Sequence, residues 1–190
     1  MNVLLLNGVH KKEDHATQIY QVIYHHLKTT KHQVKSYNLS RLNIAPCMGC
    51  FGCWIQTPGE CMIDDDGRLI VRELIQHDVV IYFSPITFGG YSCELKKAID
   101  RFIPDIMPFF RIVQNEIHHV PRYKKYPNLL FIGTLPSENP AMEKTFFQLN
   151  RRNVLNMNPH LYSQAIFYHH QPEEEVQPKF KELMKDVELI

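Results

Sequence analysis

The densest group of chemically reactive side chains in the sequence is a short run of cysteines. Four of the five cysteines fall within fifteen residues, in the spacing C-x2-C-x2-C-x7-C: Cys47, Cys50, Cys53 and Cys61. Thiols separated by two intervening residues, with a glycine in each of the first two gaps, can surround one small inorganic centre. An iron–sulfur cluster, a zinc ion, thiol exchange and simple packing all stay open, because the spacing matches neither the bacterial ferredoxin run nor paired zinc knuckles. The fifth, Cys93, stands alone and is expected to be a small buried side chain.

Two polar loops offer a second kind of chemistry, the binding of an anion and of a flat ring. The first loop, Gly8–Thr17, joins an apolar run to a helical segment, and the amides at a helix start bind phosphate. Thr17 offers a hydroxyl, while His10, Lys11 and Lys12 supply positive charge. A solvated, capped turn is the alternative, because no glycine-rich phosphate fingerprint is present.

The second loop, Ser84–Ser92, follows the most strongly apolar run of the chain. Pro85 fixes the backbone, and Gly89 permits another group to approach it closely. Thr87 adds a hydroxyl and Phe88 an aromatic face. These residues suit a planar ring bound edge-on to backbone amides, whereas the alternative is a turn whose aromatic residues belong to the core.

Short apolar runs alternate with amphipathic segments, and this alternation predicts where the loops lie. Strands are expected at residues 2–7, 33–39, 78–86, 128–135 and 161–169. Helices are expected at residues 16–28, 67–77, 92–103, 142–154 and 173–189. Residues 104–127 form a proline- and aromatic-rich excursion without a clean period. The length predicts a single domain, residues 1–190.

This order of elements predicts the fold class. Strands separated by helices form βαβ units, and right-handed crossovers leave few arrangements. The shortest is an α/β doubly wound parallel sheet of five strands, order 2-1-3-4-5, with helices on both faces. Ligands bind such sheets beyond the carboxyl ends of the strands, where the order reverses. That point lies between the first and third strands, so loops 8–17 and 84–92 are expected to meet there.

The composition of the chain limits the classes of partner that we expect it to bind. The formal net charge is +1, which argues against a nucleic-acid binder that relies on a bulk basic field. Apolar runs are too short to span a membrane, and no cationic leader precedes residue 1, so a cytoplasmic protein with reduced thiols is expected. Asp64–Asp66 is interpreted as a helix cap rather than a cation site, and adjacent histidine pairs are not expected to share a metal.

From residue 1 to about residue 135 the chain resembles the flavodoxin-like NAD(P)H-dependent FMN reductases, including the iron–sulfur flavoproteins. The resemblance rests on residues 3–8 leading to Thr17, on 46–66 with its cysteines and aspartates, and on 84–89 with 94–101. It implies that FMN binds at the switch point, which is the point between the first and third strands where the strand order reverses. The FMN phosphate would lie in the first loop and its ring on the second. The implied cofactor-binding residues are Gly8, Val9, His10, Thr17, Pro85, Ile86, Thr87, Phe88, Gly89 and Gly133, the last joined by Thr134.

The resemblance also implies a reaction and partners. Hydride would pass from NAD(P)H to FMN, and electrons onward to a quinone, a nitroaromatic, a free flavin or a cluster. Amides from Thr87 to Gly90 would stabilise charge on the reduced ring, so no catalytic side chain is assigned. In the iron–sulfur members a 4Fe-4S cluster would occupy the cysteines. A homo-oligomer is implied, with residues 104–127 near the flavin, and Trp54 and Tyr91 are expected to wall its pocket. A thiol-based electron carrier and a flavin-free partner-binding module are the alternatives.

Overall fold

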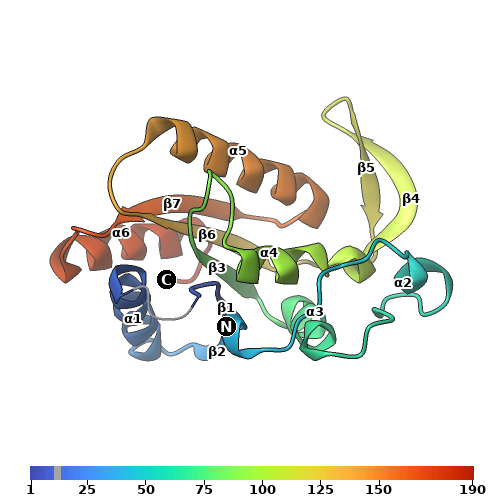
Figure 1. The fold of residues 1–190 in the computed structure, drawn as a ribbon, viewed down its shortest axis with the longest axis horizontal. Helices are drawn as coiled ribbons and strands as arrows, with labels where there is room; N and C mark the ends of the chain where they lie inside the picture. Colours follow the sequence, from blue (N-terminus) through green and yellow to red (C-terminus); the bar gives the residue numbers. More distant parts are fainter. Residues whose placement is uncertain (11–13) are drawn as a thin grey trace.

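A five-stranded parallel sheet forms the centre of the computed structural model, which describes residues 1–10 and 14–190. The strand order is β2-β1-β3-β6-β7. Because β4 and β5 pair separately, this order is the predicted 2-1-3-4-5 (Figure 1). The sheet strands are β1 (Asn2–Asn7), β2 (Gln33–Asn38), β3 (Val79–Pro85), β6 (Asn128–Leu135) and β7 (Tyr162–Tyr168).

The predicted helices are present with boundaries shifted by a few residues. They are α1 (Asp14–Lys28), α3 (Asp66–Gln76), α4 (Cys93–Asp100), α5 (Pro140–Met157) and α6 (Glu173–Asp186). A short helix, α2 (Gly52–Ile55), lies inside the cysteine segment. Two 3-10 turns, η1 (Leu39–Arg41) and η2 (Ile103–Asp105), complete the connections. Among the described residues, none of these helices is both long and apolar enough to cross a membrane.

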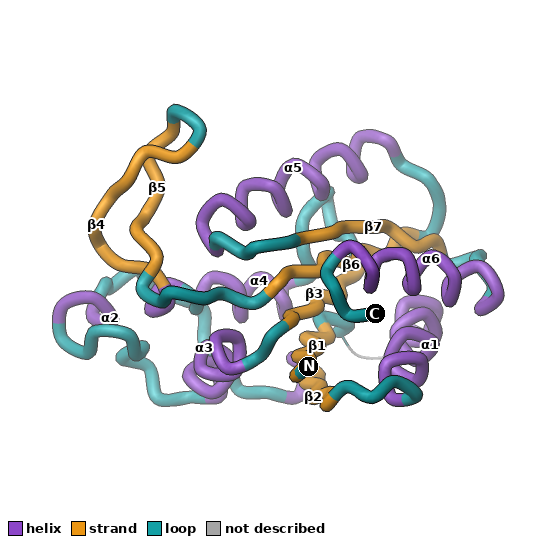
Figure 2. The backbone as a smooth tube through the Cα atoms, turned by 180° about the vertical axis from the view of Figure 1, so that it is seen from behind, coloured by secondary structure: helices purple, strands orange, loops and turns teal. Residues whose placement is uncertain are grey.

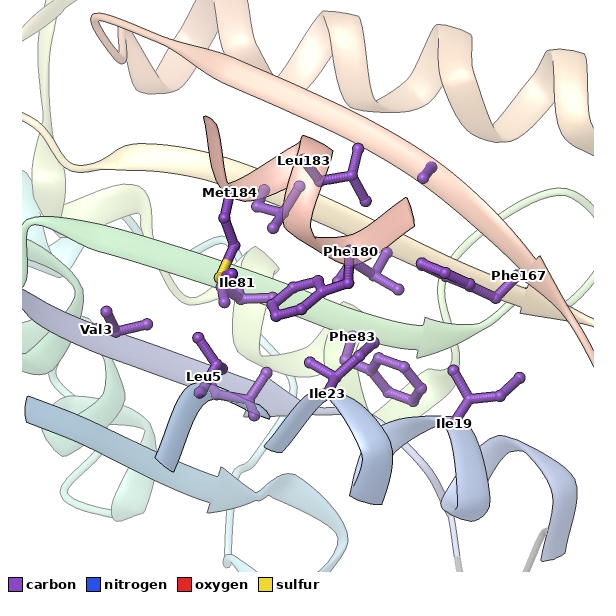
Figure 3. Packing of buried hydrophobic residues seen from close by; sticks show 14 of the residues in the cluster. Val3, Leu5, Ile19, Ile23, Ile81, Phe83, Phe167, Phe180, Leu183 and Met184 are labelled. Atoms are coloured by element: carbon purple, nitrogen blue, oxygen red, sulfur yellow. The ribbon is translucent and has the colours of Figure 1, made fainter. Parts of the chain in front are cut away.

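Each face of the sheet is covered by its own set of helices. Helices α1 and α6 pack on one face, where Ile23 and Phe180 meet Ile81 from the sheet (Figure 3). Helices α3, α4 and α5 cover the other face, contributing Leu74, Leu95 and Phe146. The central strand β3 is buried along its whole length, as expected for a strand covered on both faces. The doubly wound arrangement is therefore built on two hydrophobic layers.

The excursion at residues 104–127, which has no clean period in the sequence, contains regular structure. It forms an antiparallel hairpin, β4 (Ile106–Val113) and β5 (Glu116–Pro121), that pairs outside the main sheet. Figures 1 and 2 show it projecting beyond the end of the sheet. Its turn places Gln114 and Asn115 at positive φ without a glycine. Since many of its apolar side chains are exposed rather than alternating against a core, the usual strand periodicity is missing.

Candidate functional site

The loops after β1 and β3 meet at one edge of the sheet, as the topology predicts. The Gly8 amide donates to the Phe83 carbonyl over 2.8 Å, and the Ser92 hydroxyl donates to the Gly8 carbonyl over 2.5 Å. A side chain on Gly8 would collide with Ser92 and Leu95, so glycine is required for this close approach. The two loops are therefore held against each other by one backbone hydrogen bond and one from the Ser92 side chain.

The first loop uses several of its polar groups internally. Val9 is buried, and its amide donates to Asn7 Oδ1 over 3.0 Å. His10 Nδ1 lies 3.0 Å from Glu94 Oε1 rather than facing an open anion site. Thr17 is half-buried on the second turn of α1. Lys11 and Lys12, expected to add positive charge, lie outside the described residues.

The second loop forms a tight turn that exposes an aromatic ring. Thr87 and Gly90 each donate an amide to the other's carbonyl, at 3.0 and 2.9 Å. Within the described residues, the amides of Phe88 and Gly89 have no such partner, so two of the four expected donors remain. Phe88 is 92% exposed and adopts a left-handed φ of 51°, which is unfavourable for a bulky residue. Strained backbone of this kind is concentrated at ligand-binding and active-site loops of proteins.

The other expected contacts at this edge lie largely in the core. Pro85 and Ile86 are buried, and Ile86 donates its amide to the Thr134 carbonyl over 3.0 Å. Gly133 lies under Ile86 and Phe146, where any side chain would clash. The Thr134 hydroxyl is buried without a hydrogen-bond partner. It is thus an orphaned polar atom at the carboxyl end of β6.

Trp54 and Tyr91, expected as walls of a flavin pocket, have structural partners elsewhere. The Trp54 indole N–H donates to the carbonyls of Ile103 and Ile106, and its ring stacks on Phe51. This contact anchors the base of the hairpin to the cysteine segment. Tyr91 is buried, and its hydroxyl donates to Asn150 Oδ1 over 2.6 Å. Both aromatic residues are thus explained by packing.

All four clustered cysteines line a single cavity of about 270 Å³. Cys47 and Cys50 are exposed, Cys61 is half-buried and Cys53 is buried. Burial, together with the three neighbouring thiols, raises the pKa of Cys53 to about 11. A metal ion bound among these sulfurs would reverse that effect, because thiolate is the form that coordinates metals.

The four thiols are donors of a kind that holds metals. Four cysteine sulfurs can bind a zinc ion, and they can also bind an iron–sulfur cluster with one thiolate on each iron. The chemistry of the donor set therefore fits a metal centre of either kind.

A buried ion pair secures both ends of the cysteine segment. Arg101 is fully buried and makes a two-pronged contact with Asp65, at 2.8 and 2.9 Å. The same guanidinium donates to the carbonyls of Ala45, before the first cysteine, and Ile63, after the last. Its Nε, at the wall of the cavity, is buried without a partner. A positive wall with a spare N–H suits an anionic group such as a cluster with four thiolates.

The three consecutive aspartates have protein partners, in agreement with the predicted cap. Asp65 accepts from the Gly67 amide at the start of α3, over 2.8 Å. Burial alone would raise the pKa of Asp65, but Arg101 and the amides of Ala45 and Gly67 outweigh it, so the pKa lies below its usual range. Asp64 pairs with Arg68 over 3.1 Å.

A buried acid beside the cavity was missed by sequence reasoning. Asp105 is 1% exposed, and its Oδ2 has no hydrogen-bond partner. It lines a second cavity, of about 430 Å³, that also has Cys61 and Arg68 in its wall. Burial raises the pKa of Asp105 to about 8, so the carboxyl is mostly protonated at neutral pH. Nothing in its local sequence distinguishes it from an exposed aspartate.

Comparison with known proteins identifies the family of this chain. The profile of the family described as NADPH-dependent FMN reductase matches residues 1–116. An iron–sulfur flavoprotein of Methanocaldococcus jannaschii is 29% identical over 104 residues, which cover 55% of this chain and 53% of that protein. One from Methanosarcina thermophila is 26% identical over 103 residues, covering 54% and 53%. The chain thus spans about half the length of the curated relatives it matches.

Solved structures show the same fold at low identity. An azoreductase from Bacillus anthracis superposes with a TM-score of 0.71 at 12% identity, covering 100% of both chains. An NAD(P)H:quinone oxidoreductase from Methanothermobacter marburgensis superposes with a TM-score of 0.70 at 12% identity, covering 99% and 97%. Fold and edge together define a flavodoxin-like protein. The family match specifies it further: the chain belongs to the NADPH-dependent FMN reductase family.

Proposed function

We propose that this chain binds FMN at the edge where β1 and β3 end, and that it transfers electrons from NAD(P)H to a small acceptor such as a quinone or a free flavin. The observation that carries the proposal is the joined pair of loops at the switch point, with Phe88 held exposed at its tip. Membership of the FMN reductase family supports the choice of cofactor.

The chain's own contribution is to bind and orient. When bound, FMN supplies the redox chemistry, taking hydride from the nicotinamide and returning electrons to the acceptor. The two remaining turn amides, of Phe88 and Gly89, would donate to the edge of the ring. The start of α1 would receive the phosphate, with its dipole favouring negative charge. The Phe88 ring would limit water at one face.

The matched pair Gly89→Ala and Gly90→Ala tests this site. Gly89 has a φ of 80°, and a side chain there would meet Thr145 at 2.8 Å. At Gly90 a side chain would find only ordinary contacts, the nearest at 3.6 Å. We expect wild type and G90A, purified without oxygen, to show twin flavin bands that bleach with NAD(P)H. G89A should bind FMN at least about tenfold more weakly, with thermal unfolding confirming that it folds. Colourless wild-type protein that takes up no added FMN would contradict the proposal.

The cysteine cavity supports a second component, a 4Fe-4S cluster held by Cys47, Cys50, Cys53 and Cys61. Four thiols line one cavity beside a buried guanidinium, and the curated relatives described above are named iron–sulfur flavoproteins. Cys53→Ser should then abolish stoichiometric iron and the brown absorbance of anaerobic protein. Cys93→Ser, outside the cavity, should keep both. An equal iron content in the two variants, or no iron in the wild type, would contradict the cluster and leave flavin as the only redox group.

The exposed apolar surface of the hairpin supports a second proposal, that the protein forms a homo-oligomer. Its exposed apolar side chains are Phe109, Phe110, Ile112 and Ile117. A cluster of exposed apolar residues on one projecting element is typical of an interface. We expect light scattering to give a mass above that of one chain. Replacing Phe110 and Ile112 with serine should return it to a monomer.

A further inference from the structure

Three metal-ligating side chains converge at the loop edge, apart from the cysteine cavity. They are His10, which follows β1, and Cys93 and Glu94, which open α4. One ligand atom from each lies within 4.8 Å of the other two. Cys93 is exposed, although a buried side chain was predicted, and therefore needs another explanation.

The distances between these three ligand atoms are close to those of a zinc site. Glu94 Oε1 lies 3.0 Å from His10 Nδ1 and 3.6 Å from Cys93 Sγ. In tetrahedral zinc, with bonds of about 2.0–2.3 Å, neighbouring ligand atoms lie roughly 3.3–3.6 Å apart. An ion could therefore enter with only small side-chain movements. Imidazole, thiolate and carboxylate are all common zinc ligands.

The surrounding structure holds these ligands in place. Lys97 Nζ lies 2.7 Å from Glu94 Oε2, which leaves Oε1 facing His10 and Cys93. An outer partner of this kind commonly orients a metal-binding carboxylate. The Ser92 hydroxyl, which caps α4, also donates to the Gly8 carbonyl. The two segments that carry the ligands are thus joined directly beside the site.

The charge of the three ligands and their accessibility to solvent also suit a zinc ion. The Cys93 thiolate, formed by loss of the thiol proton, and the Glu94 carboxylate, which is shared with Lys97, would offset most of the charge of a zinc ion. The side chain of Glu94 is buried, whereas His10 and Cys93 are exposed, so an ion can reach the site from solvent. With three protein ligands, the fourth position stays open for water or another oxygen ligand.

We propose that His10 Nδ1, Cys93 Sγ and Glu94 Oε1 bind one zinc ion with an open fourth position. The site depends neither on bound flavin nor on a filled cysteine cavity. Its ligand set is mixed, with a single sulfur, so it differs chemically from any metal held by the four clustered cysteines.

Zinc binding to the purified protein, after chelator treatment, tests the site. Calorimetry should show one zinc ion per chain in this site, and zinc X-ray absorption should show one sulfur and three nitrogen or oxygen ligands. Lys97→Met, which removes only the outer partner, should weaken binding by about tenfold. His10→Ala and Cys93→Ser remove ligands and should weaken it more, by roughly 100-fold or beyond.

Cys53→Ser provides the matched control, because it removes a cysteine of the other group. It should leave the single-sulfur zinc signal unchanged. Two results would overturn the proposal: equal zinc affinity in wild type, His10→Ala and Cys93→Ser, or a four-sulfur zinc environment that disappears in Cys53→Ser. Because the measurement detects zinc and not flavin, it is independent of the proposed oxidoreductase activity.

Discussion

The loop edge and the cysteine cavity position their groups by different physical means. The edge lies where parallel strands end, so the sheet itself brings Gly8 and Ser92 together. The cavity lies in irregular chain around α2. Figure 1 and Figure 2 both show α2 far from α1. There the buried pair of Arg101 and Asp65 replaces the sheet as the organising element. The loop edge is thus held by the sheet and its backbone, whereas the cavity is held by side chains, with the buried pair of Arg101 and Asp65 at their centre.

The largest expected effect tests that dependence directly. Arg101→Met leaves Asp65 buried and unpaired, so we expect a loss of about 3–5 kcal/mol in the free energy of unfolding. Hydrogen exchange should accelerate most in residues 46–62. Lys96→Ala, which removes an exposed cation from the same helix and breaks a surface pair with Asp100, should cost under about 1 kcal/mol. Similar costs for the two variants would mean that the cavity does not rely on the buried pair.

A smaller effect concerns Asp105, in the wall next to the cavity. Its folded pKa, about 8, lies above the ordinary value of about 4, so its contribution to stability is complete below about pH 4 and is lost progressively as pH rises to about 8. Between pH 6 and 8 the wild type should lose about 2 kcal/mol from this group. Urea unfolding of Asp105→Asn should lack that loss, while the exposed Asp100→Asn should retain it. Parallel pH profiles in wild type and Asp105→Asn would refute the assignment.

At the loop edge, Ser92→Ala removes both a helix cap and the contact with Gly8. We expect a loss of about 1–2 kcal/mol, measured by chemical unfolding. Asn139→Ala removes the corresponding cap of α5 without touching the contact between Gly8 and Ser92, and should cost about 1 kcal/mol. Affinity for FMN should fall only in Ser92→Ala. If both variants weaken FMN equally, the effect is one of general stability.

The smallest expected effect is an increase in the free energy of unfolding. Phe88 pays for its left-handed backbone, and asparagine tolerates that conformation better. Phe88→Asn should therefore raise the free energy of unfolding by about 0.5–1 kcal/mol while weakening flavin binding. Thermal unfolding and flavin titration measure the two effects. A stability loss in Phe88→Asn would show that the exposed ring makes stabilising contacts.

The same contrast explains what could be predicted from sequence. The strands and the meeting of loops 8–17 and 84–92 were predictable, because buried parallel strands leave continuous apolar runs such as Val79–Phe83. The cysteine spacing indicated a common site. Arg101 and Asp105 were not predictable, since a buried charge looks like an exposed one until the chain around it is folded. The strands of the hairpin were not predicted, because many of their apolar side chains are exposed and the sequence therefore lacks the usual alternation of apolar and polar residues.

The hairpin also offers an engineering opportunity. In the described chain β4 and β5 pair only with each other, and their turn at Gln114 and Asn115 projects away from the sheet. Extra residues at this turn leave the register of β3 and β6 unchanged, because both strands are held by other partners. A reporter domain could therefore be inserted there, and through Trp54 and its neighbours at the hairpin base it would sense changes in the cysteine segment.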